Sequence, residues 1–125
     1  MMQDYTKLNV WQKAHALTLS IYNITTVFPK SEAFGITSQM RRAAFSIPAN
    51  VAEGCGRGTN RELRQFLYIA VGSASELDYY LLLARDLGIL PPKQFPVLKA
   101  RITEVRRMLA GLIESINTAA SQTSN

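Results

Sequence analysis

The chain has 125 residues, of which 47% are hydrophobic, and it carries a formal net charge of +5 at pH 7. This size and composition are typical of one globular domain with a hydrophobic core, and they exclude a disordered chain. The single cysteine, Cys55, excludes an internal disulfide, and no apolar run approaches the roughly 20 residues of a membrane-spanning helix. We therefore expect a cytoplasmic protein without a membrane partner, whose positive charge permits binding to nucleic acid.

The first predicted helix covers residues 10–28. Its apolar residues alternate in steps of four and three, the spacing that places them on one face of a helix: Val10, Ala14, Leu17, Ile21, Ile24 and Phe28. Asn9 and Gln12 are expected to cap its N-terminus, and Pro29 is expected to end it.

The second predicted helix covers residues 37–53 and contains a proline. Its apolar stripe repeats the same spacing: Ile36, Met40, Ala43, Ile47 and Val51. Pro48 has no backbone N–H, and its ring clashes with the carbonyl of Ala44, so we predict a kink at this position. Gly54 is expected to end the helix in the left-handed conformation.

The third predicted helix covers residues 60–87, and we expect it to be the longest and the most buried. Thr59 and Glu62 have the spacing of a capping box at its start, and Gly88 is expected to close it. One heptad stripe is expected to enter the core: Leu63, Leu67, Ala70, Ala74, Leu77, Leu81 and Ala84. A second stripe lies beside it: Phe66, Ile69, Ser73, Tyr80 and Leu87.

The fourth predicted helix begins after Pro91 and Pro92 and ends near Asn117. Its core stripe follows the same spacing: Leu98, Ile102, Val105, Leu109, Leu112 and Ile116. The polar residues 118–125 are expected to fray. Because short connections make neighbouring helices antiparallel, residues 1–125 are predicted to form one all-α domain, an antiparallel up-down-up-down four-helix bundle with a kinked second helix.

Few residues of the sequence offer catalytic chemistry. Cys55 has no base near it in sequence, and His15 is the only histidine, so we expect no catalytic residue, no metal site and no cofactor. The carboxylates that precede the glycine-rich turn and lie on the third helix are expected to form structural ion pairs with basic residues of the first two helices. This set contains Glu53, Glu76, Lys13, Arg41 and Arg42.

Two groups of basic residues are candidates for binding an anion or nucleic acid. Arg57, Arg61 and Arg64 follow the glycine-rich turn at residues 54–58, and the first turns of a helix disfavour a cation that has no other role. The alternative is a purely structural turn, in which neighbouring glutamates neutralise part of this cluster. The second group lies on the fourth helix: Lys99, Arg106 and Arg107.

A ridge of the third helix points away from the predicted core, since a helix turns by about 100° per residue. Its side chains are aromatic, small and aliphatic in turn: Tyr68, Gly72, Ser75, Tyr79 and Leu82. On the second helix, Phe45 lies nearly opposite the core stripe. Exposed apolar surface of this kind marks contact with a partner, so we predict an oligomer interface here.

Four runs of the sequence resemble a bacterial four-helix bundle family that is first known from proteins encoded in intervening sequences of large-subunit ribosomal RNA genes. The runs are VWQKAH at 10–15, SQMRRAA at 38–44, SIPANVAEG at 46–54 and FLYIAVGS at 66–73. The resemblance extends over residues 8–116. Cys55 is a departure, since family members often carry an aromatic residue at that position.

The resemblance implies a protomer that assembles into a ring, typically a homopentamer. It also implies similarity to the accessory protein of diversity-generating retroelements, a basic pentameric barrel that binds nucleic acid and a reverse transcriptase. Two hypotheses follow. In the first, a non-enzymatic homo-oligomer binds RNA or DNA, with structured RNA favoured, through an arginine-rich surface. In the second, a scaffolding oligomer binds another protein and no nucleic acid. An enzyme is disfavoured because no pair of nucleophile and base can be assembled.

Overall fold

The computed structural model describes residues 3–123, and the regular structure in this range is entirely helical. The four α helices are α1 (Asn9–Thr25), α2 (Ile36–Cys55), α3 (Asn60–Asp86) and α4 (Gln94–Thr123). Two short 3-10 helices, η1 (Tyr5–Lys7) and η2 (Lys30–Glu32), precede α1 and α2. The prediction of an all-α domain with four helices is confirmed. None of these helices is both long enough and apolar enough to cross a membrane.

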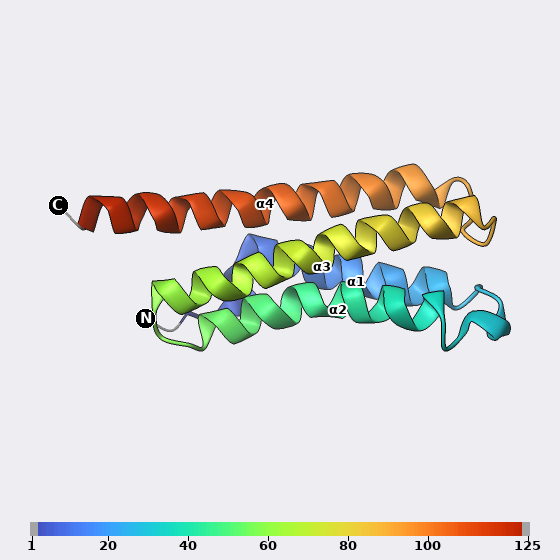
Figure 1. Ribbon diagram of the computed structural model, residues 1–125, viewed down its shortest axis with the longest axis horizontal. Helices are drawn as coiled ribbons and strands as arrows, with labels where there is room; N and C mark the ends of the chain where they lie inside the picture. Colours follow the sequence, from blue (N-terminus) through green and yellow to red (C-terminus); the bar gives the residue numbers. More distant parts are fainter. Residues whose placement is uncertain (1–2, 124–125) are drawn as a thin grey trace.

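The four helices lie lengthwise beside one another (Figure 1). The connections from α1 to α2 and from α3 to α4 lie at one end of the bundle, and the connection from α2 to α3 lies at the other end. Among the pairs of α helices that contact each other, contacts are most extensive between α2 and α3 and least extensive between α1 and α4. The last turns of α4 extend beyond the ends of the other helices (Figure 1).

The hydrophobic core is built from one apolar stripe of each helix. Every residue of the predicted α3 stripe is buried, and Leu67, Ala74, Leu77 and Leu81 are completely inaccessible to solvent. In α4 the stripe ends on Ile113 and Ile116, while Leu112 is only half-buried. The periodicity therefore identified the main core face of each helix, because burial in a bundle follows the turn of the helix. The second stripe expected on α3 is only partly buried, since Ser73 is buried but Ile69 and Leu87 are exposed. In α1, Ile24 is half-buried.

Two expectations about helix length are wrong. The longest helix is α4, with 30 residues against 27 in α3, because the helical conformation continues past Asn117 to Thr123. Of the tail that was expected to fray, residues 124–125 lie outside the described range.

The first helix is shorter than predicted. It ends at Thr25 rather than at Phe28, and the Thr25 hydroxyl donates to the carbonyl of Ile21 at 2.7 Å. Phe28 is nevertheless buried, in the turn that follows.

The caps of α1 and α2 also differ from the prediction. Leu8, rather than Asn9, is the N-cap of α1, since η1 leads directly into the helix, and the side-chain amide of Gln12 donates to the carbonyl of Thr6 at 2.9 Å. Gly54 lies inside α2 instead of ending it. A Cβ atom at Gly54 would lie 2.9 Å from Cδ1 of Leu63 and 3.0 Å from Cβ of Phe66, so this glycine permits close packing of α2 on α3.

The predicted caps of α3 are confirmed. The N–H of Glu62 donates to the hydroxyl of Thr59 at 3.2 Å. At the C-terminus, Gly88 adopts a φ of 74°, the left-handed region that favours glycine. The N–H of Ile89 donates to the carbonyl of Ala84 at 3.1 Å and that of Gly88 to Arg85 at 3.0 Å, which is the hydrogen-bond pattern of a Schellman motif.

Pro48 lies inside α2 and is buried. Because proline has no N–H, the carbonyl of Ala44 loses its donor within the helix. The hydroxyl of Thr18, on α1, lies 3.0 Å from that carbonyl oxygen and 2.9 Å from the carbonyl oxygen of Ala14. A threonine hydroxyl of the neighbouring helix thus takes the place of the missing backbone donor.

A second polar contact joins α2 to α3. The hydroxyl oxygens of Ser46 and Ser73 lie 2.8 Å apart, and Ser73 is buried. The side-chain amide of Asn50 donates to the carbonyl of Ser46 at 2.8 Å and to its hydroxyl at 3.0 Å. These contacts satisfy polar groups that would otherwise be costly to bury.

Substitution of Thr18 by valine tests the contact at Pro48. Thr18→Val keeps the shape of the side chain and leaves the Ala44 carbonyl buried without a donor, so we expect the free energy of unfolding to fall by about 1–3 kcal/mol. Thr103→Val is the control, because that hydroxyl donates to the carbonyl of Lys99 in its own helix and is exposed. Urea unfolding of both variants measures the difference.

A double-mutant cycle isolates the interaction itself. Pro48→Ala restores a backbone N–H at this position, so Thr18→Val should cost less in that background. An equal cost in both backgrounds would show that Thr18 acts elsewhere.

Candidate nucleic-acid interface and subunit surface

The first basic cluster lies where residues 56–59 connect α2 to α3. Nε of Arg57 is 3.5 Å from a carboxylate oxygen of Glu53, and its guanidinium group lies 5.0 Å from the centre of the Phe66 ring. Arg64 donates from Nη1 to the side-chain oxygen of Asn117 on α4 at 2.8 Å. Arg61 is exposed and has no partner within residues 3–123.

The acidic residues at this turn neutralise only part of the cluster. Glu53 pairs with Arg57, but the carboxylate of Glu62 accepts a hydrogen bond from the Thr59 hydroxyl at 3.2 Å as part of the cap. Asn117, the partner of Arg64, carries no charge. Arg61 and Arg64 therefore retain their positive charge at the N-terminus of α3, where the helix dipole disfavours a cation.

The second basic group is held by an acidic residue that sequence reasoning missed. Nζ of Lys99 lies 2.7 and 2.8 Å from the two carboxylate oxygens of Asp78, on α3, and Nη1 of Arg106 lies 3.7 Å from one of them. The Asp78 side chain is only 20% exposed. Arg107 is exposed and has no partner in the described part of the chain. No local signal marks Asp78, because its partners lie on another helix.

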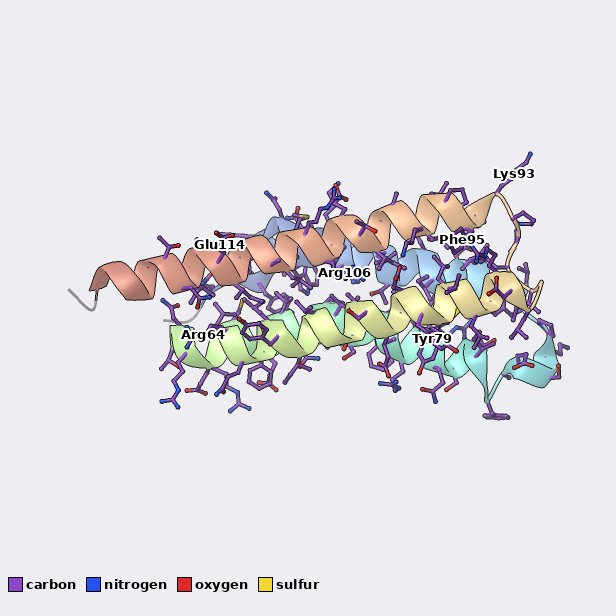
Figure 2. The ribbon with its side chains drawn as sticks, turned by 45° about the horizontal axis from the view of Figure 1, so that its top comes forward. Arg64, Tyr79, Lys93, Phe95, Arg106 and Glu114 are labelled. Carbon is purple, nitrogen blue, oxygen red and sulfur yellow. The ribbon has the colours of Figure 1, made fainter. Side chains whose placement is uncertain are left out.

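The ridge predicted on α3 is exposed along its length. Tyr68 and Tyr79 are 55% and 56% exposed, Gly72, Ser75 and Leu82 lie between or beside them, and Phe45 of α2 is 46% exposed. A Cβ atom at Gly72 would meet nothing within 4 Å. Packing within the protomer therefore gives no reason for a glycine that costs roughly 0.5–1 kcal/mol in a helix relative to alanine. Arg64, Arg106 and Tyr79 lie along the side of the bundle that α3 and α4 form (Figure 2).

The residues expected in structural ion pairs have mixed partners. Nη2 of Arg42 lies 3.1 Å from a carboxylate oxygen of Glu76, and Nζ of Lys13 lies 3.6 Å from one of Glu104. Arg41 contacts no carboxylate within the described range. It lies at the C-terminus of α1, whose carbonyl groups attract a cation. Both ion pairs are about half-exposed, so each contributes about 0–1 kcal/mol.

Cys55 is buried, whereas His15 is exposed and stacks on an aromatic ring. The thiol of Cys55 is buried at the end of α2, and this burial raises its pKa. His15 stacks on Trp11 with ring centres 4.9 Å apart and planes 8° from parallel, and the ring of Tyr5 also packs on Trp11, at 5.1 Å. The described residues contain no group of three side chains suited to hold a metal ion.

Comparison with known proteins identifies relatives of the chain. The family model described as 23S rRNA-intervening sequence protein matches residues 6–111, which confirms the resemblance seen in the four sequence runs. Among solved structures, the chain is similar to a protein of unknown function from the S23 ribosomal protein family of Bacteroides thetaiotaomicron, with 24% sequence identity and a TM-score of 0.77. The similarity covers 84% of this chain and 95% of that one, and at this identity it supports the fold alone. A comparison with curated proteins gives no match.

The reactivity of Cys55 tests its burial in solution. A raised pKa lowers the fraction of thiolate at any given pH, and the thiolate is the nucleophile. We therefore expect iodoacetamide to modify the native protein at pH 8 far more slowly than the urea-unfolded chain, as followed by mass spectrometry. The rate on the native protein should rise as the pH increases beyond the ordinary pKa of a thiol. Equal rates in the native and unfolded states would contradict the buried position.

Proposed function

We propose that this chain, which belongs to the 23S rRNA-intervening sequence protein family, is a non-enzymatic, self-associating bundle that binds nucleic acid, with structured RNA as its ligand. The observation that carries the proposal is the pair of arginines at the start of α3. Neither Arg61 nor Arg64 has an acidic partner among residues 3–123. A guanidinium group offers planar, forked donors that match a phosphate group, so a phosphate backbone is the ligand that this pair fits.

The position of the two arginines supports an anionic ligand further. Arg61 and Arg64 lie in the first turns of α3, where the free N–H groups of a helix also favour a negative charge. The net charge of +5 adds a long-range attraction for polyanions. Repetition of the cluster around a ring would produce a band of positive potential with no need for sequence-specific contacts.

The topology of the bundle, the bend of α2 and the assembly of subunits are part of the same proposal. We infer an antiparallel up-down-up-down bundle, a bend of α2 at Pro48, and assembly into a ring, a homopentamer by the family resemblance. Short connections at alternate ends of the bundle support the topology. The missing N–H of Pro48 supports the bend. The exposed ridge on α3, with Gly72 at its centre, supports close contact with a second copy. The free thiol of Cys55 is in keeping with a cytoplasmic location.

A second candidate function rests on the same ridge. Tyr68, Tyr79 and Leu82 form exposed apolar surface that also suits contact with a different protein. In that case the protein is a scaffold that binds no nucleic acid. The dependence of binding on salt separates the two, because phosphate contacts release counterions and apolar contacts do not.

The double substitution Arg61→Gln, Arg64→Gln tests the RNA-binding proposal. We expect the fold and the oligomer to survive and the affinity for a structured RNA to fall similarly across sequences. The slope of log affinity against log salt should flatten by about 0.7 to 0.9 for each phosphate group that the variant no longer neutralises. Fluorescence anisotropy at several salt concentrations measures both quantities.

Whereas the arginine substitutions remove positive charge, Asp78→Asn increases the positive charge that has no acidic partner. This substitution keeps the size of the side chain and releases Lys99 and Arg106 from their shared carboxylate. We expect tighter RNA binding if the α3–α4 side contributes to the surface. If the double arginine variant keeps both the affinity and the slope of the wild type while Asp78→Asn changes them, the RNA lies on the second basic group instead.

The oligomer interface is tested by charge on the ridge. Tyr79→Asp should lower the mass in light scattering, and the double change Phe45→Asp, Tyr79→Asp should lower it further, with helix content unchanged in circular dichroism. Val97→Asp is the control, because Val97 is 54% exposed and belongs to α4 rather than to the ridge. An unchanged mass in the double variant would place the interface elsewhere.

A further inference from the structure

A groove of about 450 Å³ lies beside the first half of α2. The connection from α1 to α2 is at the end of the bundle opposite the start of α3, which carries Arg61 and Arg64 (Figure 1). It is lined mainly by Tyr22 of α1 and by Phe34, Thr37, Ser38, Arg41 and Phe45. We propose that this groove binds a single unpaired nucleotide of an RNA. The choice of RNA rests on the proposed function, but the site is separate from the arginine pair at the start of α3.

Aromatic rings bound the groove. Phe34, in the turn that precedes α2, is 99% exposed, and Phe45 and Tyr22 are about half-exposed. A phenylalanine ring with almost its whole surface in water is unfavourable unless a partner covers it. Stacking on such rings is the interaction through which proteins hold the unpaired bases of single-stranded nucleic acids.

Arg41 places a fixed positive charge in the groove. Its Nε donates to the hydroxyl of Thr25 at 2.8 Å, its Nη2 donates to the carbonyl of Tyr22 at 3.4 Å, and its guanidinium group lies 4.8 Å from the centre of the Tyr22 ring. All of these partners are uncharged, so they hold the guanidinium group in place without neutralising it. An anchored cation beside aromatic rings suits one phosphate group next to a stacked base.

Of the two arginines that line the groove, Arg41 is the one without an acidic partner. Arg42 also lines the groove, but it is paired with Glu76 and bonded to Gln39. The carboxylate of Glu32 lies close to Gly35, at the start of α2 and outside the lining residues. A negative charge there opposes the binding of a phosphate, so its removal should strengthen binding.

Two hydroxyl groups complete the lining. Thr37 is only 8% exposed, and its hydroxyl has no hydrogen-bond partner in the described part of the protein. Ser38, beside it, is exposed. The Thr37 hydroxyl oxygen is itself inaccessible to solvent, so the exposed hydroxyl of Ser38 is the one that a ribose or phosphate oxygen in the groove can reach. The groove thus offers aromatic rings for the base, a hydroxyl group for the sugar and a guanidinium group for the phosphate.

The experiment uses the full-length protein and adenosine 5′-monophosphate as the probe, followed through backbone amide NMR shifts. We expect the amides of Thr37 and Ser38 to shift and ribose 5-phosphate to bind at least roughly five-fold more weakly, since it lacks the stacking base. Phe34→Ala should weaken binding by a similar factor, and Glu32→Gln should strengthen it. Phe34 is chosen because its exposed ring supports no packing in the protomer, whereas Phe45 also belongs to the predicted oligomer interface. Leu87→Ala is the control, at another exposed apolar residue.

A bulged RNA hairpin and its fully paired counterpart separate this inference from the proposed function. The wild type should prefer the bulged hairpin, and Phe34→Ala should lose that preference while keeping the salt slope. The variant Arg61→Gln, Arg64→Gln should lose the slope while keeping the preference. A failure of the proposed function would appear as no binding to either hairpin at any salt concentration.

Three results would overturn the nucleotide site. One is equal binding of inorganic phosphate, ribose 5-phosphate and adenosine 5′-monophosphate, which would show a simple anion site. Another is a lower oligomer mass in Phe34→Ala without any nucleotide binding by the wild type, which would make the groove a contact between copies. The third is hairpin binding with the same preference in Phe34→Ala as in the wild type.

Discussion

The bundle depends on how α2 is accommodated with a proline at its centre. Pro48 leaves the carbonyl of Ala44 without a donor inside a buried helix, and an unpaired buried carbonyl is costly. The Thr18 hydroxyl of α1 shares its one proton between this carbonyl and that of Ala14 in its own helix, which links α1 to α2 at this position. The contact between Ser46 and Ser73 performs the same role between α2 and α3. Apolar stripes alone allow helices to slide by a turn, but these polar contacts are satisfied in one register only.

Ion pairs between helices neutralise part of the charge of the bundle. Arg42 pairs with Glu76, and Lys99 pairs with Asp78. Other arginines contact uncharged groups or have no partner within residues 3–123, among them Arg41 near the α1–α2 turn, and Arg61 and Arg64 at the start of α3. Lys93 extends from the connection before α4 (Figure 2). Positive charge without an acidic partner is therefore present at both ends of the bundle, where it can attract a polyanion.

The exposed aromatic residues lie on two separate faces. The α3 ridge of Tyr68 and Tyr79 surrounds a glycine with open space above it, which suits the close approach of another helix. The groove on α2 contains an anchored arginine and the exposed hydroxyl of Ser38, which suit a polar ligand. Phe45 lines the groove and is also a predicted residue of the oligomer interface, so the two proposals share one residue.

The sequence by itself determined the helices and their core faces. The heptad spacing of Leu67, Ala74, Leu77 and Leu81, the cap at Thr59 and the left-handed Gly88 depend on residues within a few positions, so local rules were sufficient. Only the tertiary structure decided that Gly54 allows α2 to pack closely on α3, that Thr18 reaches Ala44, and that Asp78 holds Lys99. It likewise decided that Arg41 joins Tyr22 and Phe34 around a groove. These contacts depend on how far each helix is rotated and shifted against its neighbours, and the periodicity of a single helix carries no information about that.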